Sequence, residues 1–389
     1  MAKLRVLTII GTRPEAIKMA PVVKELASRR DEVDSFVVAT AQHREMLDQV
    51  LDLFHITPQR DLDVMLENQD LFQLTREIVE KMEPVYREFS PQLALVQGDT
   101  TTTFIGSLLS YYWGSLVGHV EAGLRSGDKQ NPYPEEINRR LTSVLADYHF
   151  APTARARENL LREGVPEARI AITGNPVIDA LLLIAREPFD LSASGPLQGL
   201  PLEGRRLVLV TAHRRENFGK PLRNICRALI ELAQRFKELA IIYPVHPNPN
   251  VRRTVEAVLS GRERIHLTEP IDYRTCVHLM KRSYIILTDS GGIQEEAPTF
   301  GTPVLVLRRV TERPEAVEAG AAQVVGTDPG HILSAATSLL TDETRHQAMS
   351  RAINPFGDGR AAGRIVTVRL ERRSEIIAAA RRPAAYVSV

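Results

Sequence analysis

Cysteine is scarce in this sequence of 389 residues, which contains only Cys226 and Cys276. The two residues form no Cys-x-x-Cys pair, and both lie in segments with the apolar periodicity of helices, so we expect reduced core thiols rather than a disulfide framework. No apolar run approaches the length of a membrane span, and the N-terminus opens into a strand-like segment without the regions of a signal peptide. These absences predict a cytoplasmic protein with no membrane partner.

Charge of one sign is not in excess either. Lys and Arg number 49 and Asp and Glu number 48, which gives a formal net charge of +1. This balance provides no field that would attract nucleic acid or an anionic membrane, so an anionic ligand would have to be bound by a local site. We therefore expect no nucleic acid partner.

The motifs of several common cofactors are also missing. No Gly-x-Gly-x-x-Gly follows the first strand-like segment, as a nicotinamide or flavin site of the dinucleotide-binding type requires, and no Gly-x-x-x-x-Gly-Lys-Ser/Thr indicates a P-loop. No spacing of His, Cys and carboxylates favours zinc. The sequence therefore predicts chemistry without a bound cofactor or metal.

Short apolar runs alternate with amphipathic stretches along most of the chain, and runs of this length are typical of strands buried on both faces of a parallel sheet. The first series comprises Leu4–Ile10, Ser35–Thr40, Leu93–Gln97 and Leu116–Val120. The second series comprises Leu207–Thr211, Ala240–Pro244, Ile265–Thr268, Ile285–Thr288 and Val304–Leu307. Two such series predict an α/β protein with two doubly wound domains, which would bind a ligand beyond the carboxyl ends of their strands, in a cleft that both domains face.

The domain boundaries follow from the same pattern. We assign residues 1–175 to the first domain and residues 176–362 to the second. The segment 187–204 is rich in Pro, Gly and Ser, which indicates a linker or surface loop near the boundary. We expect the last helical stretch, within residues 363–389, to cross back to the first domain.

Polar residues gather where the predicted strands of the first domain end. Asp99 follows one strand, Glu121 ends the next, and Glu135 opens a helix. Each has a structural alternative: Asp99 as a helix cap, Glu121 in a salt bridge, and Glu135 as an ordinary residue of a first helical turn. Three carboxylates at consecutive loops of one sheet edge nevertheless indicate an acid–base site. Arg13 and Lys18, after the first strand, could add positive charge at a helix N-terminus or could simply be solvated.

The second domain contains a candidate site for an anion. A strand is followed by the turn Ser290–Gly292 and then by a helix. Backbone amides at such a turn can cradle a phosphate or diphosphate, because glycine lets the backbone approach. Glu296 could accept hydrogen bonds from ribose hydroxyls, and Arg313 would add a cation. His213 and His246 follow the first two strands of this domain, where a single histidine would more often be structural.

Together these motifs resemble those of the non-hydrolysing UDP-N-acetylglucosamine 2-epimerases. The matching segments are GTRPEAIKMAP, TAQHREMLDQVL, GDTTTT, HVEAGLRSGD, PEEINRRLT, HRREN, YPVHPNPNV, LTDSGGIQEEAP and TERPEAV, which extend roughly from Leu4 to Gly359. The resemblance implies two Rossmann-like domains of the glycosyltransferase B type, a homodimer, and no nicotinamide or metal. It also implies interconversion of UDP-N-acetylglucosamine and UDP-N-acetylmannosamine, which feeds bacterial envelope polysaccharides.

The resemblance implies roles for individual residues. The catalytic acid and base positions match Asp99, Glu121, Glu135 and His213. The nucleotide-binding positions match Arg13, Ser290, Gly291, Gly292, Glu296 and Arg313, and Lys18 lies near the sugar–phosphate region. A second UDP-N-acetylglucosamine can bind to bacterial members as an allosteric activator, and the positions lining that site match Gln42, His43, Gln69, Glu136, Arg214 and His246.

The chemistry of the sugar favours one mechanism. A pyranose C2 proton is not acidic, because no carbonyl is adjacent, so an epimerase must either oxidise C3 with a nicotinamide or eliminate the nucleotide. The missing dinucleotide motif favours elimination, in which a base removes the C2 proton as UDP leaves C1, and UDP then adds back to the glycal. The alternatives are a hydrolysing 2-epimerase that releases UDP and N-acetylmannosamine, a glycosyltransferase of the same fold, and an inactive nucleotide-sugar-binding protein.

Overall fold

The computed structural model describes residues 2–40, 44–65 and 69–380. The chain divides into two compact units: unit 1 comprises residues 1–180 and 356–389, and unit 2 comprises residues 181–355. The sequence predicts boundaries after residue 175 and at residue 363, whereas the chain passes into unit 2 after residue 180 and returns to unit 1 at residue 356. The segment 187–204 belongs to unit 2, where it forms the 3-10 turns η2 (Leu191–Ala193) and η3 (Gly195–Leu197).

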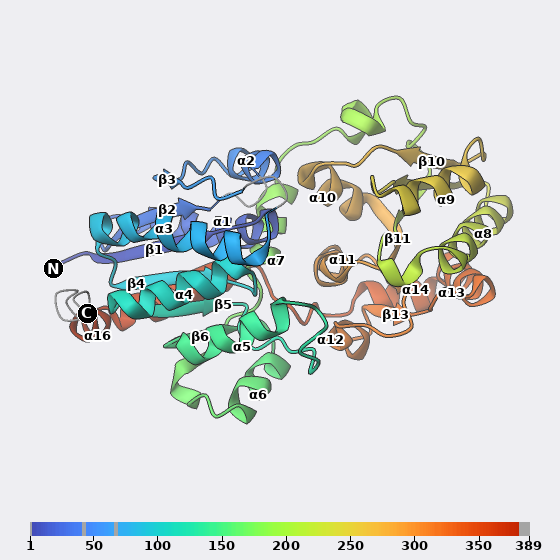
Figure 1. Cartoon of the computed structure of the whole chain (residues 1–389). Helices are drawn as coiled ribbons and strands as arrows, with labels where there is room; N and C mark the ends of the chain where they lie inside the picture. Colours follow the sequence, from blue (N-terminus) through green and yellow to red (C-terminus); the bar gives the residue numbers. More distant parts are fainter. Residues whose placement is uncertain (1, 41–43, 66–68, 381–389) are drawn as a thin grey trace. The chain divides into compact units, whose positions relative to one another are not determined.

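Unit 1 contains a seven-stranded sheet in the order β3-β2-β1-β4-β5-β6-β7, in which every pair is parallel (Figure 1). The strands are β1 (Leu4–Ile10), β2 (Val33–Ala39), β3 (Arg60–Asp61), β4 (Leu93–Gln97), β5 (Leu116–Val120), β6 (Tyr148–Ala151) and β7 (Ile170–Ile172). The helices are α1 (Arg13–Ser28), α2 (Arg44–Leu53), α3 (Leu71–Phe89), α4 (Thr101–Trp113), α5 (Glu135–Leu145), α6 (Ala154–Arg162), α15 (Ala361–Glu371) and α16 (Arg373–Ala379), with the 3-10 turn η1 (Glu167–Arg169). Helix α7 (Pro176–Ala185) carries the chain from unit 1 into unit 2.

Unit 2 contains a six-stranded parallel sheet in the order β10-β9-β8-β11-β12-β13. The strands are β8 (Arg206–Thr211), β9 (Leu239–Pro244), β10 (Ile265–Thr268), β11 (Ser283–Thr288), β12 (Val304–Val306) and β13 (Ala322–Val324). The helices are α8 (Lys220–Arg235), α9 (Pro249–Leu259), α10 (Tyr273–Arg282), α11 (Gly291–Glu296), α12 (Pro314–Glu318), α13 (Pro329–Thr341) and α14 (Glu343–Ser350), with the 3-10 turns η4 (Arg215–Asn217) and η5 (Ala297–Phe300).

The apolar runs explain why these strands form. All five residues of β4 are buried, and β1 is buried at six of its seven positions. Such continuous burial requires helices on both faces of a parallel sheet. In unit 2 the amphipathic helix α8 contributes Leu222, Ile225 and Leu229 to the core, where they lie in one cluster with Val208 and Val210 of β8. Each sheet therefore has its own core and presents its own set of strand ends.

The chain after β5 depends on a glycine. Gly123 has a φ of +90°, and a Cβ atom at this position would lie 2.2 Å from the backbone oxygen of Ala156. Only glycine adopts this conformation without strain and allows the backbone to approach α6 so closely. The turn thereby determines where the chain runs after Glu121, at the carboxyl edge of the unit 1 sheet.

Two further expectations concern individual segments. Within the described ranges, no helix is both long and apolar enough to cross a membrane. Cys226 is buried in α8, as expected for a core thiol, whereas Cys276 in α10 is only half-buried.

Candidate active site

The carboxyl ends of β1, β4 and β5 lie side by side in the unit 1 sheet, because β4 pairs with both of the other strands. Arg13 begins α1 directly after β1, Asp99 follows β4, and Glu121 follows β5. In a doubly wound sheet this edge is where ligands bind. The topology thus brings together residues that are more than a hundred positions apart in the sequence.

Glu121 is held by several hydrogen-bond donors. It is 7% exposed and has a φ of +64°, a left-handed conformation that is uncommon for a residue with a side chain. Lys18 Nζ lies 2.7 Å from both carboxylate oxygens, Asn175 Nδ2 donates to Oε1 at 2.8 Å, and Gln97 Nε2 donates to Oε2. These contacts favour the ionised carboxylate, because each stabilises negative charge. The salt bridge that the sequence left open is therefore present, and Lys18 contacts Glu121.

Asp99 forms an ion pair with Arg139 Nη2, and this carboxylate is more accessible than that of Glu121, with its side chain 29% exposed. Glu135 is half-buried at the first position of α5. Glu136, predicted to bind an activator, is 1% exposed and accepts hydrogen bonds from the backbone amides of Ser126 at 3.0 Å and Gly127 at 3.4 Å. Glu136 therefore anchors a loop in this structure.

Two buried titratable residues support the same edge. Glu15 accepts hydrogen bonds from the backbone amides of Gly11 and Thr12, and burial raises its pKa to about 7. His119 Nε2 bonds the Gly98 backbone oxygen at 2.7 Å, and burial lowers the pKa of His119 to about 3, so the ring is neutral at neutral pH. These residues hold the turns that precede Arg13 and Asp99.

In unit 2 the completely buried Asp289 organises the loop after β8. Its Oδ2 accepts hydrogen bonds from the backbone amides of His213 at 2.8 Å and Arg214 at 2.9 Å, and from Asn217 Nδ2 at 2.9 Å. Burial lowers the pKa of His213, although Asp289 opposes this shift. The ring of His213 stacks on His246 with centroids 5.2 Å apart. The two histidines singled out in the sequence therefore lie in contact.

The Ser290–Gly292 turn begins α11, as the sequence predicted. A Cβ atom on Gly291 would lie 3.8 Å from the Nη2 atoms of both Arg214 and Arg313, so two guanidinium groups flank the turn. An anion beside this turn would meet both cations and the first amides of the helix. Glu296 is 7% exposed and accepts a hydrogen bond from Tyr273 Oη at 3.0 Å.

The remaining predicted residues are less informative. Gln42 and His43 lie outside the described residues. Gln69 is half-buried and donates to the Val64 backbone oxygen at 2.8 Å. Among the residues that the structure describes, no group of three or more His, Cys, Asp or Glu side chains could hold a metal ion.

Sequence reasoning missed several residues that shape these two edges. The sequence did not indicate roles for Arg139 and Asn175, because the carboxylates that they contact are distant in the sequence. Glu15 and Asp289 lie within motifs that were recognised, but neither was given a role. His119 was read only as part of a strand. One available signal was that Asn175 directly precedes a proline at the point where the strand pattern restarts.

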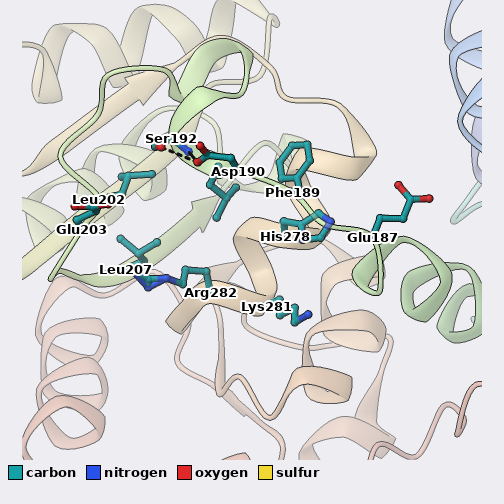
Figure 2. Close-up of a pocket in the computed structure, with 11 residues that line it drawn as sticks. Glu187, Phe189, Asp190, Ser192, Leu202, Glu203, Leu207, His278, Lys281 and Arg282 are labelled. Carbon is teal, nitrogen blue, oxygen red and sulfur yellow. Dashed lines mark hydrogen bonds between the residues drawn. The ribbon is translucent and has the colours of Figure 1, made fainter.

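A separate cavity of about 480 Å³ lies within unit 2 and is lined by none of the predicted site residues. Figure 2 shows Phe189 lying against His278, with Asp190 and Ser192 on one side and Lys281 and Arg282 on the other. The rings of Phe189 and His278 stack with centroids 4.6 Å apart. This stacking attaches the segment 187–204 to α10.

Comparison with known proteins decides the family. The family model described as UDP-N-acetylglucosamine 2-epimerase matches residues 24–369. The chain belongs to this family. A UDP-N-acetylglucosamine 2-epimerase of Yersinia pestis is 54% identical over 367 residues, which cover 93% of this chain and 97% of the relative.

Solved structures agree with this family and confirm the predicted fold class. The chain resembles the UDP-GlcNAc 2-epimerase of Neisseria meningitidis bound to UDP-GlcNAc, with a TM-score of 0.86, 46% identity, and coverage of 95% of this chain and 100% of that one. A glycosyltransferase of kitacinnamycin shares the fold alone, with a TM-score of 0.62, 10% identity, and coverage of 97% of this chain and 100% of that one. The two parallel sheets are therefore those of a glycosyltransferase B-like fold, as expected from the sequence.

Proposed function

We propose that this epimerase interconverts UDP-N-acetylglucosamine and UDP-N-acetylmannosamine by eliminating UDP and adding it back, without net hydrolysis. The family assignment supports the substrate and the carbon that changes configuration. The observation that carries the mechanism is the set of carboxylates after β4 and β5, in which Glu121 accepts hydrogen bonds from Lys18 and two side-chain amides. Such a cluster can move a proton at C2 and stabilise positive charge at C1.

The carboxylates differ in ways that suggest different roles. Glu121 is buried and surrounded by donors, so it would remain ionised and stabilise the positive charge that develops at C1 as UDP leaves. Asp99 is more accessible than Glu121, which would let it exchange a proton with C2, and Arg139 would hold its carboxylate in place. Glu135 and the neutral ring of His213 are the further acid–base candidates. A proton removed from C2 by one group and returned to the opposite face by another accounts for inversion.

The nucleotide would be held by residues of unit 2. We assign the diphosphate to the Ser290–Gly292 turn, where Arg214 and Arg313 supply positive charge. Glu296, positioned by Tyr273, would accept hydrogen bonds from the ribose hydroxyls. Tight retention of UDP matters to the mechanism, because released UDP would leave the glycal to react with water.

The decisive experiment is proton NMR of UDP-N-acetylglucosamine with the purified protein in D2O, without added cofactor. We expect deuterium at C2 and the appearance of UDP-N-acetylmannosamine, with no lasting accumulation of UDP. Stoichiometric UDP together with N-acetylmannosamine would instead indicate a hydrolysing enzyme. An unchanged spectrum would refute the epimerase proposal for this substrate.

Variants test the carboxylates individually. We expect Asp99→Asn, Glu121→Gln and Glu135→Gln each to lower kcat by about 10²-fold or more, the usual contribution of a positioned acid or base for Asp99 and Glu135 and of electrostatic stabilisation for Glu121. A suitable control is Glu83→Gln, which removes an exposed carboxylate paired with Arg87 on α3. A near-normal kcat in all three site variants would show that the cluster is not the acid–base machinery.

Three further expectations stay predictions. Activation by a second UDP-N-acetylglucosamine would involve Arg214 and His246, of which Arg214 flanks the proposed diphosphate site. A homodimer follows from the family resemblance. A cytoplasmic location is predicted from the sequence.

A further inference from the structure

Asn175 lies in unit 1, close to the point where the chain passes into unit 2. It directly precedes α7, and the chain passes into unit 2 within that helix, after Ala180. The returning chain enters unit 1 at Phe356. The Asn175 backbone amide donates to the Phe356 backbone oxygen at 2.7 Å, so the outgoing and returning segments are hydrogen-bonded to each other.

Neighbouring contacts reinforce this junction within unit 1. Gly174 has a φ of +84°, and a Cβ atom there would lie 3.2 Å from the Cα atom of Gly357, which shows how closely the two segments pass. Asp179 accepts hydrogen bonds from the backbone amides of Ala361 at 3.1 Å and Ala362 at 2.9 Å, at the start of α15. The outgoing helix and the returning helix are therefore anchored to each other near the boundary.

The side chain of Asn175 connects this junction to Glu121. The residue is 1% exposed; its Nδ2 donates to Glu121 Oε1 at 2.8 Å, and its Oδ1 accepts from the backbone amide of Val177 at 3.1 Å. This orientation of the amide is the one that the contacts require, because the reverse would place Oδ1 against a carboxylate and Nδ2 against an N–H donor. Because one amide group makes both contacts, capping of α7 by Oδ1 requires Nδ2 to point toward Glu121.

We propose that Asn175 is a positioning residue for epimerisation: its amide orients the Glu121 carboxylate, keeps it ionised and ties it to the junction of the outgoing and returning segments. The inference rests on the proposed function, in which Glu121 acts on the sugar. In a buried setting a donated hydrogen bond stabilises the charged form of a carboxylate strongly. Loss of this donor would leave a carboxylate that is both more mobile and easier to protonate.

Other groups face Glu121 and must be considered in any pH dependence. Lys18 of α1 supplies a positive charge, and Gln97 at the end of β4 supplies a second amide donor. His119 of β5 lies close enough to interact electrostatically with Glu121, but burial lowers the pKa of that ring to about 3 and keeps it neutral near neutral pH. Removal of the Asn175 donor should therefore destabilise the ionised form of Glu121 only in part, because the donors Lys18 and Gln97 remain.

Two substitutions separate positioning from a purely structural role. Asn175→Ser and Asn175→Asp both keep an oxygen that can cap α7, but neither donates to Glu121: serine is too short, and aspartate replaces the donor by a negative charge. Asn175→Ala removes the cap as well. Thr153→Ala is the matched control, since it removes the N-cap of α6 in the same unit.

We expect Asn175→Ser to lower kcat about 10-fold, the usual effect of losing a hydrogen bond to a charged group, with KM within about threefold. The acidic limb of the kcat–pH profile should move to higher pH, and should move further in Asn175→Asp. A purely structural role predicts that serine and aspartate restore the activity that alanine loses, with an unshifted pH profile, and this outcome would overturn the proposal. Thr153→Ala should leave the profile unchanged.

Glu121→Gln distinguishes failure of this inference from failure of the proposed function. If Glu121→Gln is inactive while Asn175→Ser and Asn175→Asp behave like the native enzyme, the role of Asn175 is refuted and that of Glu121 stands. If Glu121→Gln retains full activity, the role of Glu121 itself is refuted, and with it the basis for the inference. Should Asn175→Asp fail to fold, the neutral Asn175→Ser variant still gives the pH profile that decides the matter.

Discussion

Replacing Glu15 by glutamine should make the stability of unit 1 less dependent on pH. Glu15 is 2% exposed at the start of α1, and its pKa is raised from 4.5 to about 7, principally because burial penalises the charged form. Hydrogen bonds from the backbone amides of Gly11 and Thr12 offset part of this penalty. Glutamine keeps the size and the acceptor oxygen of the side chain but cannot ionise.

The direction and the magnitude of the change in unfolding free energy with pH follow from the linkage between protonation and folding. Because the pKa of Glu15 is higher in the folded chain, the folded state binds more protons between pH 4.5 and about 7. The stabilisation is complete below pH 4.5 and is lost as pH rises through about 7. A shift from 4.5 to about 7 corresponds to roughly 3 kcal/mol, at 1.36 kcal/mol per unit. As pH rises from 4 to 8, the unfolding free energy of Glu15→Gln should therefore increase by about 3 kcal/mol relative to that of the native chain.

The single tryptophan provides a convenient assay, because Trp113 lies in α4 of unit 1. Urea unfolding of both proteins, followed by tryptophan fluorescence at several pH values, gives the difference in unfolding free energy at each pH. The buried His119 and His149, with pKa values lowered to about 3 and about 4, destabilise both proteins as pH falls below 6.5, so their contributions cancel in the difference. A difference that stays constant from pH 4 to pH 8 would refute the reasoning that Glu15 retains its proton to about pH 7.

Two further predictions concern packing. Gly123→Ala should lower the unfolding free energy by more than about 2 kcal/mol, because it combines an unfavourable positive φ with a steric clash against the Ala156 backbone oxygen. A thermal unfolding midpoint equal to that of the native chain would contradict this prediction. Phe189→Ala removes the ring that stacks on His278 and lies under the Arg274 guanidinium. It should therefore speed limited proteolysis within residues 187–204 while leaving kcat unchanged. An unaltered cleavage rate would show that this stacking does not hold the segment in place.

The longer strands were predictable because burial on both faces demands a continuous apolar run. The runs Leu4–Ile10, Leu93–Gln97, Leu116–Val120 and Ile265–Thr268 coincide with β1, β4, β5 and β10. The strands β3, β6, β7 and β13 were not predicted. They contain two to four residues each, which leaves only a weak apolar pattern, although β10 is as short and was predicted; β6 is also interrupted by the buried His149.

The candidate site was predictable in part for a related reason. Parallel strands present their carboxyl ends at one edge, so the sequence positions of Asp99, Glu121 and His213 after predicted strands were enough to mark them. Their surroundings were not predictable. Whether Glu121 faces water, a cation or an amide depends on Lys18 and Asn175, and nothing in the spacing of these residues indicates that they meet.

By itself, therefore, the sequence determined the α/β class and marked Asp99 and Glu121 as polar residues at strand ends, because these depend on local periodicity and on which residues follow a strand, while the resemblance of its motifs to a known family supplied their expected roles. Only the tertiary structure decided that Asn175 connects Glu121 to the junction of two distant segments, and that Glu15 is buried, which raises its pKa. Burial and hydrogen bonding of a side chain depend on what the rest of the chain packs around it, and that information is not local.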